Sequence, residues 1–457
     1  MLATRAASKR LGVRFLAAHG LRGQRKDATN FGDDRVSFMF TLEHDRPGAL
    51  REALELFFRH DVQLTHIESK PVPLGENQIE FFLDAAVDGE EARANLDKCL
   101  EHMKSRSEDY SQVLVTGSKE VPWFPRNLEE LDSLANNVLE AGADLESDHP
   151  GFNDPEYRSR RKEIAQFAAD FKLGRPIDYI EYTEAENATW QAVWNQLVPQ
   201  FRKHGCKEFL ESFDLLRERG AYKEDQVPQL RDVSAVLAQE SGFMLRPVAG
   251  LLSARDFLYG LAFRVFYCTQ YIRHSSRPLY TPEPDVVHEL MGHAPLFANR
   301  DFADFSQCIG LAAIGATDEQ ILQLARCYWF TVEFGLCRQD NDLKVYGAGI
   351  LSSPGELEYA MTSDEPERVP WDPFVAAHTD YPITTYQPKY FVADSFADAT
   401  DRMREFADSF ERPFGVSFNP ATKTIIVDRN VKLLSREETL QQQADAAKKQ
   451  LDSQKVE

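Results

Sequence analysis

The first regular alternation of hydrophobic and polar positions starts at Arg35 and runs through residues 36–42 with a period of two. This alternation predicts a half-buried strand. Pro47 then begins a predicted helix. The apolar residues of this helix form one stripe, Leu50, Leu54, Phe57 and Phe58. Further strands are predicted over 62–67, 79–83 and 113–115, with a second helix over 90–103. The resulting βαββαβ order is that of a ferredoxin-like unit, which buries one sheet face under two helices.

From residue 154 onward most hydrophobic positions follow helical spacing instead. Helices are predicted over 154–171, 190–203, 206–219, 229–241, 253–274, 302–314, 318–333 and 393–410. Strand signals in this region are few and short. The predicted fold class is therefore α+β, with a small N-terminal sheet unit followed by a mostly α-helical region.

The C-terminal end has a different pattern. Two short runs of strand formers, 416–418 and 424–427, flank Asn419-Pro420-Ala421-Thr422 and predict a β-hairpin. Downstream apolar residues fall on the a and d positions of a heptad, although Glu437 interrupts the series. They are Leu433, Leu440, Ala444, Ala447 and Leu451. So short a seam suits a weak oligomerisation helix, with a solvated tail as the alternative.

Composition excludes several classes of protein. The chain has 457 residues and a net charge of −21, which argues against nucleic acid or anionic lipid as the main partner. The sequence contains no run of 18 apolar residues, so no membrane span is predicted. Its six cysteines are scattered without a C-x-x-C pair, which is typical of reduced thiols in an intracellular protein. The expected partners are small molecules and further copies of the chain.

Residues 1–26 contain seven Lys or Arg and no acidic residue. A mitochondrial targeting segment has this composition. A disordered basic tail on a cytoplasmic protein has it too, and we favour that interpretation for residues 1–34.

Candidate metal ligands occur in His288-Glu289-Leu290-Met291-Gly292-His293. The two histidines are five residues apart, which places them about 140° apart around an ideal α-helix. They can bind one ion only if the helix ends or bends between them. Gly292 is where such a bend is easiest, because glycine tolerates irregular backbone conformations.

Glu333 is the third candidate ligand, because it interrupts an apolar and aromatic run, 327–337. A buried, unpaired carboxylate is unfavourable by several kcal/mol, and binding to a divalent cation removes that penalty. Two histidines and one carboxylate form the facial triad of non-haem Fe(II) oxygenases. The alternative is that the histidines are hydrogen-bonded core residues and that Glu333 pairs with an arginine.

Long segments resemble the aromatic amino acid hydroxylases in order and spacing. They are 246–297, 328–336, 346–356 and 391–418. The resemblance covers nearly the whole chain after about residue 35. It implies an ACT regulatory domain at 35–117, a catalytic domain at 118–418, and a tetramerisation hairpin and helix at 419–457. It also implies a homotetramer or homodimer in the cytoplasm.

The resemblance further implies Fe(II) and tetrahydrobiopterin as cofactors. Iron would be bound by His288, His293 and Glu333. A flat pterin should stack on an aromatic ring, and the residues implied at its site are Gly250, Leu251, Leu252, Phe257, Glu289 and Ala325. Glu289 is in addition implied as a catalytic residue that organises water and O2 near the iron.

For an amino acid substrate the resemblance implies Arg273 as the α-carboxylate clamp, because arginine binds a carboxylate through two parallel hydrogen bonds. Thr281 and Ser352 would assist it. Trp329 and Pro284 would enclose the substrate ring, and Phe334 would form a wall of the pocket. Asp285 is expected to orient His288.

Three positions favour phenylalanine among the aromatic substrates. Ile383 stands where tyrosine-hydroxylating members carry an aspartate, and it offers no partner for a phenol. Leu251 and Trp329 stand where tryptophan-hydroxylating members have tyrosine and phenylalanine. The implied reaction is 4-hydroxylation of L-phenylalanine by O2, with tryptophan 5-hydroxylation as the alternative within the family. A zinc hydrolase in which Glu289 activates water is the alternative from another class.

Overall fold

The structure is a computed structural model of the 457-residue chain. It describes residues 35–43, 48–71, 78–106, 110–115, 120–138, 145, 149–383, 385–410, 412, 414–427 and 431–441. The predicted basic tail and most of the predicted oligomerisation seam lie outside these residues. The chain divides into two compact units between Val115 and Thr116.

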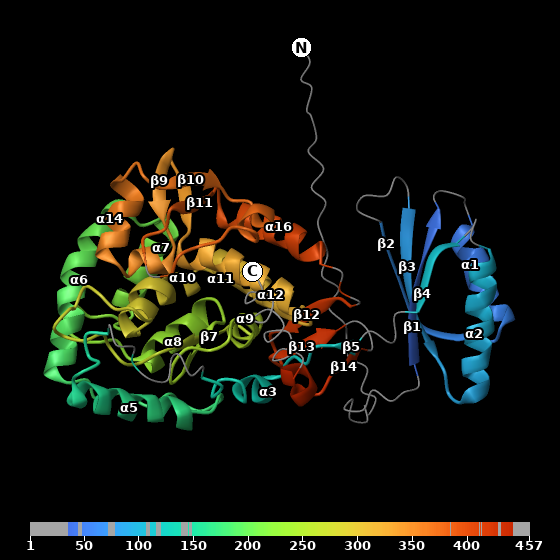
Figure 1. The fold of residues 1–457 in the computed structure, drawn as a ribbon, viewed down its shortest axis with the longest axis horizontal. Helices are drawn as coiled ribbons and strands as arrows, with labels where there is room; N and C mark the ends of the chain where they lie inside the picture. Colours follow the sequence, from blue (N-terminus) through green and yellow to red (C-terminus); the bar gives the residue numbers. More distant parts are fainter. Residues whose placement is uncertain are drawn as a thin grey trace, which may run out of the picture. The chain divides into compact units, whose positions relative to one another are not determined.

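The first unit has the element order βαββαβ that the sequence predicts. Its elements are β1 (Arg35–Glu43), α1 (Ala49–Arg59), β2 (Gln63–Pro71), β3 (Gln78–Ala86), α2 (Glu90–Ser105) and β4 (Tyr110–Val115). The strands form one antiparallel sheet in the order β2-β3-β1-β4. Figure 1 shows both helices on one face of this sheet. That face forms a core of its own, because alternate residues of β1 and β3 point into it.

The predicted apolar stripe of α1 is only partly buried. Phe57 is 1% exposed, whereas Phe58 is 84% exposed and Leu50 and Leu54 are more than one third exposed. The residues that pack into the core with Phe57 are Ala53 and Leu56. The stripe that faces the sheet is therefore offset from the predicted one, since residues 53, 56 and 57 share a helix face.

The second unit is mostly helical. Its helices are α3 (Leu128–Asp132), α5 (Pro155–Asp170), α6 (Glu184–His204), α7 (Lys207–Glu218), α8 (Leu230–Glu240), α9 (Ala254–Ala262), α10 (Ala294–Phe297), α11 (Arg300–Ala313), α12 (Asp318–Tyr328), α13 (Ala348–Leu351), α14 (Pro354–Thr362), α15 (Pro373–Ala376) and α16 (Phe396–Asp408). Two further segments are π-helical, η1 (His288–His293) and η2 (Trp329–Glu333). Figure 1 shows α5 and α6 along the outside of the unit. The helix α11 packs on α9, and this close approach requires Gly310, where a Cβ would lie 2.2 Å from the backbone nitrogen of Ala262.

Strands in this unit are short. They are β5 (Glu120–Val121), β6 (Met244–Pro247), β7 (Val265–Cys268), β8 (Leu336–Gln339), β9 (Asp342–Val345), β10 (Glu367–Pro370), β11 (Lys389–Ala393), β12 (Val416–Asn419), β13 (Thr424–Val427) and β14 (Lys432–Leu433). The largest sheet has the order β10-β11-β8-β9, and β6 pairs with β7 in parallel. The antiparallel pair β12 and β13 has the bounds predicted for the C-terminal hairpin, within one residue.

One predicted helix is wrong. The helix predicted over residues 253–274 ends at Ala262, and β7 follows. Arg264 has a φ of 57°, a left-handed conformation that cannot continue a right-handed helix. Val265 and the aromatic residues after it favour strand, and they pair with β6. The change from helix α9 to strand β7 places residues 265–269 beside the candidate site.

The described residues confirm a mixed α+β protein. Among them, no helix has the length and apolar composition needed to cross a bilayer.

Candidate active site

The two candidate histidine ligands lie at the ends of a single π-helical segment, η1. A π-helix joins backbone groups five residues apart, so side chains five apart lie on nearly the same face. The Nε2 atoms of His288 and His293 accordingly lie 3.0 Å apart. The prediction that the helix ends or bends between the histidines is therefore wrong, because a wider helical turn brings them together.

Gly292 has a different role from the predicted one. A Cβ at this position would lie 2.7 Å from the carbonyl oxygen of Ala348 in α13. Gly292 therefore allows η1 to pack closely against α13, the helix that precedes Ser352.

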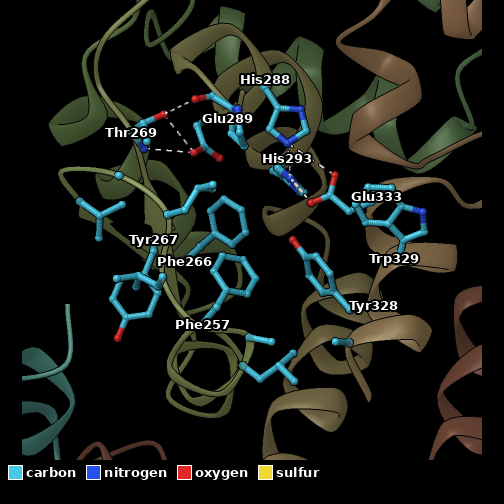
Figure 2. Close-up of a pocket in the computed structure, with 18 of the residues that line it drawn as sticks. Phe257, Phe266, Tyr267, Thr269, His288, Glu289, His293, Tyr328, Trp329 and Glu333 are labelled. Carbon is cyan, nitrogen blue, oxygen red and sulfur yellow. Dashed lines mark hydrogen bonds and ion pairs between the residues drawn. The ribbon is translucent and has the colours of Figure 1, made fainter. Parts of the chain in front are cut away.

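Glu333 ends η2 and completes the group. Its Oε1 lies 3.1 Å from Nε2 of His293 and its Oε2 lies 3.5 Å from Nε2 of His288. Figure 2 shows the three side chains converging on one point. Two metal–nitrogen bonds of about 2.1 Å at a right angle would separate the nitrogens by about 3.0 Å, which is the separation found. The three groups thus fit a single divalent ion.

Glu289 also lies near the histidines, with ligand atoms of the three residues within 4.8 Å of one another. Its Oε1, however, accepts hydrogen bonds from the backbone N–H and the hydroxyl of Thr269, at 3.1 and 3.2 Å. Glu333, at 3.1 and 3.5 Å from the two nitrogens, is therefore the better candidate for the carboxylate ligand. Glu289 lies beside the ion site as the sequence predicts.

The ionisation of the site favours metal binding. Burial lowers the pKa of His288 to about 4, so its imidazole is neutral and keeps a lone pair for a metal. Burial alone would raise the pKa of Glu333, but its electrostatic interactions with His293 and His288 outweigh burial, and the pKa falls to about 2. Burial raises the pKa of Glu289 to about 7. The two carboxylates therefore differ in character, and Glu333 is the one that stays ionised.

His288 is oriented by Ser352. The hydroxyl oxygen of Ser352 lies 2.9 Å from Nδ1 of His288, and the same hydroxyl donates to the carbonyl of Ala348 at 2.8 Å. Asp285 was expected to orient the imidazole, but its Oδ1 instead accepts from the backbone N–H of His288 at 3.1 Å. Asp285 thus fixes the start of η1, and Ser352 fixes the ring.

Ser352→Ala is expected to weaken iron binding by about 10- to 100-fold, the usual effect of removing the partner that orients a metal-binding histidine. Titration of the metal-free protein with ferrous ion measures this change. Ser353→Ala is the matched control, because the Ser353 hydroxyl caps α14 and, among the described residues, makes no hydrogen bond with His288. Equal iron affinity in the two variants would contradict the role of Ser352.

A first cavity of about 300 Å³ opens beside the ion site. All six residues predicted for a pterin line it, Gly250, Leu251, Leu252, Phe257, Glu289 and Ala325. Polar and apolar side chains lie on different sides of this cavity. Figure 2 shows Glu289 and Thr269 at one end and the rings of Phe257, Phe266 and Tyr328 on another side. Such a space suits a flat heterocycle that has polar atoms along one edge.

Sequence reasoning missed several residues of this cavity, including Thr269 and Tyr328. Thr269 holds Glu289, and Tyr328 directs its hydroxyl toward the ion site (Figure 2). Burial, and then the charge of Glu333, raise the pKa of Tyr328, so this phenol stays protonated. Tyr328 could have been predicted, because it is a polar aromatic residue near the start of the run 327–337 that contains Glu333.

A second cavity of about 410 Å³ lies on the other side of the ion site. All six residues predicted for substrate line it, Arg273, Thr281, Pro284, Trp329, Phe334 and Ser352. His288, Glu333, Leu251, Pro284 and Trp329 line both cavities. The two spaces therefore meet at the candidate metal.

Arg273 is paired within the protein. Its Nε and Nη2 donate to the two oxygens of Asp285 at 2.9 and 2.8 Å, and both side chains are at most 3% exposed. A guanidinium has five N–H donors, so this pairing leaves donors on Nη1 and Nη2. Asp285 therefore fixes the position of the Arg273 guanidinium and leaves some of its N–H donors available to another acceptor.

The segment that carries Thr281 and Pro284 is held from outside the cavity. Arg161 of α5 binds both oxygens of Glu283, and Arg161 also lies over the ring of Tyr271 at 3.9 Å. The hydroxyl of Thr281 donates to the carbonyl of Glu283 at 3.0 Å. A rigid segment therefore presents Pro284 to both cavities.

Two imidazoles and one carboxylate that fit a single cation, with two cavities that meet at them, define the site of a mononuclear metalloenzyme. The family model described as biopterin-dependent aromatic amino acid hydroxylase matches residues 122–453, and the chain belongs to this family.

Relatives agree with this assignment. The chain is 49% identical over 402 residues to phenylalanine-4-hydroxylase of Dictyostelium discoideum, covering 88% of this chain and 91% of the relative. It is 49% identical over 404 residues to phenylalanine-4-hydroxylase of Homo sapiens, covering 87% and 88%. It is 48% identical over 399 residues to tyrosine 3-monooxygenase of Mus musculus, covering 87% and 78%.

A solved phenylalanine hydroxylase of Chromobacterium violaceum, with bound iron(III) and 7,8-dihydrobiopterin, is 36% identical. The match covers 52% of this chain and 85% of that one, with a TM-score of 0.48.

Proposed function

We propose that the protein is a phenylalanine 4-monooxygenase, which converts L-phenylalanine to L-tyrosine with O2 and tetrahydrobiopterin at a non-haem Fe(II) site. The observation that carries the proposal is the junction of the two cavities at His288, His293 and Glu333. It allows one ion to face a flat reductant on one side and an amino acid on the other. When bound, iron and the reduced pterin supply the oxidising chemistry and the two additional electrons.

The three ligands occupy one side of the ion site and leave its other side open to the cavities. Phe257 offers a ring face to the pterin, and Glu289 with Thr269 offers a polar end for its ring nitrogens and carbonyl. The apolar walls, together with Tyr328, keep bulk water from the reacting atoms. Glu289 is the proposed catalytic carboxylate because it lies beside both the ion site and this cavity.

In the second cavity Arg273 would bind the α-carboxylate through its remaining N–H donors. Thr281 and Ser352 line the same cavity. Pro284, Trp329 and Phe334 would then enclose the ring and direct its far edge toward the ion, where hydroxylation takes place.

The preference for phenylalanine rests on the wall of the second cavity. Identity to the relatives does not separate the activities, because a tyrosine 3-monooxygenase is as similar as the phenylalanine-4-hydroxylases. Ile383 lines the cavity and offers no hydrogen-bond partner to a phenol hydroxyl. A phenol hydroxyl at this wall gains no hydrogen bond from the Ile383 side chain, which disfavours tyrosine relative to phenylalanine.

The test is an assay of the anaerobically purified, iron-loaded protein with tetrahydrobiopterin, O2 and each aromatic amino acid. Tyrosine formed from phenylalanine at the highest kcat/KM is the expected result. Faster formation of 5-hydroxytryptophan would overturn the substrate, and a protein that contains zinc and works without O2 would overturn the reaction.

We propose further that residues 35–117 form a regulatory ACT domain and that 419–457 support assembly into a homotetramer or homodimer. The βαββαβ order and the separate core of the first unit support the first part. A chain lacking residues 1–117 is expected to keep its kcat within about twofold and to lose only the response of its activity to prior incubation with phenylalanine. Loss of turnover on truncation would contradict a purely regulatory role.

A further inference from the structure

Trp329 and Ile383 line the second cavity from two separate segments, the start of η2 and the segment before β11. The indole of Trp329 is stacked on Tyr381, with ring centroids 4.2 Å apart and planes inclined by 16°. Its Nε1–H donates to the side-chain oxygen of Gln387 at 3.0 Å. The orientation of this wall is therefore set by two residues that do not themselves line the second cavity.

Gln387 is 1% exposed and makes four hydrogen bonds. Its side-chain oxygen accepts from Trp329, and its amide nitrogen donates to the carbonyls of Pro382 at 2.9 Å and Thr385 at 3.5 Å. An indole N–H only donates and a carbonyl only accepts, so the orientation of the amide is fixed. Its backbone N–H donates to Oε1 of Glu356 at 3.2 Å. One side chain thus joins the indole of Trp329 to the residue before Ile383.

Glu356 anchors this connection to the rest of the fold. It is a buried residue of α14, and the same Oε1 accepts from the hydroxyl of Tyr390 in β11. Ser352, the partner of His288, lies between α13 and this helix. Gln387 is therefore fixed to the elements that support the ion site, whereas Ile383 is 75% exposed and has little packing of its own.

We propose that Gln387 is a specificity-determining positioning residue, which sets the width of the amino acid pocket by holding Trp329 and Pro382, and hence Ile383, in fixed relative positions. The inference rests on the proposed function, because it assigns the second cavity to the aromatic substrate. Gln387 lines neither cavity and contacts no ligand of the ion site in the described structure.

The test is Gln387→Met in the full-length, iron-loaded enzyme. Methionine has a similar length and shape and removes all three side-chain hydrogen bonds. The KM for phenylalanine is expected to rise about tenfold, because the buried indole N–H and the carbonyl of Pro382 lose their partners. The ratio of kcat/KM for phenylalanine to that for tryptophan should fall about tenfold as the wall loosens. The KM for tetrahydrobiopterin should stay within about twofold, since the first cavity keeps Phe257 and Glu289.

Gln307→Met is the matched control. Gln307 is also a buried glutamine whose oxygen accepts from a side chain, Arg264, and whose nitrogen donates to a carbonyl, that of Ala262. It lines neither cavity. The control is expected to lower the thermal midpoint as Gln387→Met does and to leave both KM values unchanged. Equal KM changes in the two variants would show that Gln387 has only a structural role and would contradict the proposal.

A double-mutant cycle tests the path through the indole. Trp329→Phe lacks the N–H, so adding Gln387→Met to it should raise the KM for phenylalanine by no more than about threefold, against tenfold alone. Full additivity would overturn the proposal. If Gln387→Met does not fold, Gln387→Glu replaces it. Glutamate keeps an acceptor for the indole and loses the donor to Pro382. A KM for phenylalanine equal to that of the parent enzyme in this variant would also overturn the proposal.

Assays of the parent enzyme separate this proposal from the proposed function. If the parent enzyme prefers tryptophan, the substrate assignment fails, and the effect of Gln387 is then measured on the KM for tryptophan. If the parent enzyme prefers phenylalanine and Gln387→Met retains both its KM and its preference, only the role of Gln387 fails.

Discussion

Glu333→Gln is expected to remove iron from the protein and to lower turnover of phenylalanine by more than about 1,000-fold. Removing a residue that only orients a metal ligand lowers metal affinity or activity by about 10- to 100-fold, so removing a ligand itself should have a larger effect. The substitution keeps the shape of the side chain and removes the charge that faces the two imidazoles at 3.1 and 3.5 Å. Metal analysis after dialysis and a pterin-dependent assay measure the two effects.

A measurement independent of turnover is the thermal midpoint with and without ferrous ion. A ligand that binds only the folded state stabilises it, by about 2.7 kcal/mol at a concentration 100 times its Kd. The parent chain should therefore gain stability from iron, and the Glu333→Gln variant should gain none. Glu356→Gln serves as the control, because it removes another buried carboxylate that does not face the ion site. Iron retained by the Glu333→Gln variant would contradict the ligand assignment.

Arg273→Lys is expected to raise the KM for phenylalanine by about 10- to 100-fold with a smaller change in kcat, since hydrogen bonds to a charged group contribute about 1.5–3 kcal/mol. Lysine is the informative substitution because it keeps a cation beside Asp285, which is 1% exposed. Arg273→Ala would leave that carboxylate buried and unpaired, which would destabilise the folded protein by about 3–5 kcal/mol. A change in KM could then reflect a change in folding rather than in substrate binding.

The control for this experiment is Arg255→Lys. Arg255 is a buried arginine whose guanidinium contacts Asp318, Tyr259 and the carbonyl of Ala316, and it lines neither cavity. Its KM for phenylalanine should remain within about twofold of the parent value. A KM for the Arg273→Lys variant equal to that of this control would show that Arg273 does not bind the substrate carboxylate.

Local patterns were sufficient for much of the fold. The alternation over residues 36–42 predicted β1, the helical spacing near residues 318–333 predicted α12, and the runs around Asn419 predicted the hairpin. The failures lie where backbone conformation overrides periodicity. Arg264 adopts a left-handed conformation and turns a predicted helix into β7.

The residues of the candidate site could be predicted from the sequence, but the backbone conformation that brings them together could not. The spacing of His288 and His293 and the isolated charge of Glu333 identified a possible metal site, because buried charges need partners. A spacing of five is unfavourable on an α-helix, and the sequence carries no local signal for the π-helical turn that resolves it.

The sequence alone therefore determined which side chains could form the ion site and that the protein combines a small sheet unit with a helical one. Only the tertiary structure decided how those side chains are held. Ser352 meets His288 across 64 residues, and Gln387 meets Trp329 across 58. Such contacts are fixed by the packing of distant segments, which local hydrophobic spacing does not encode.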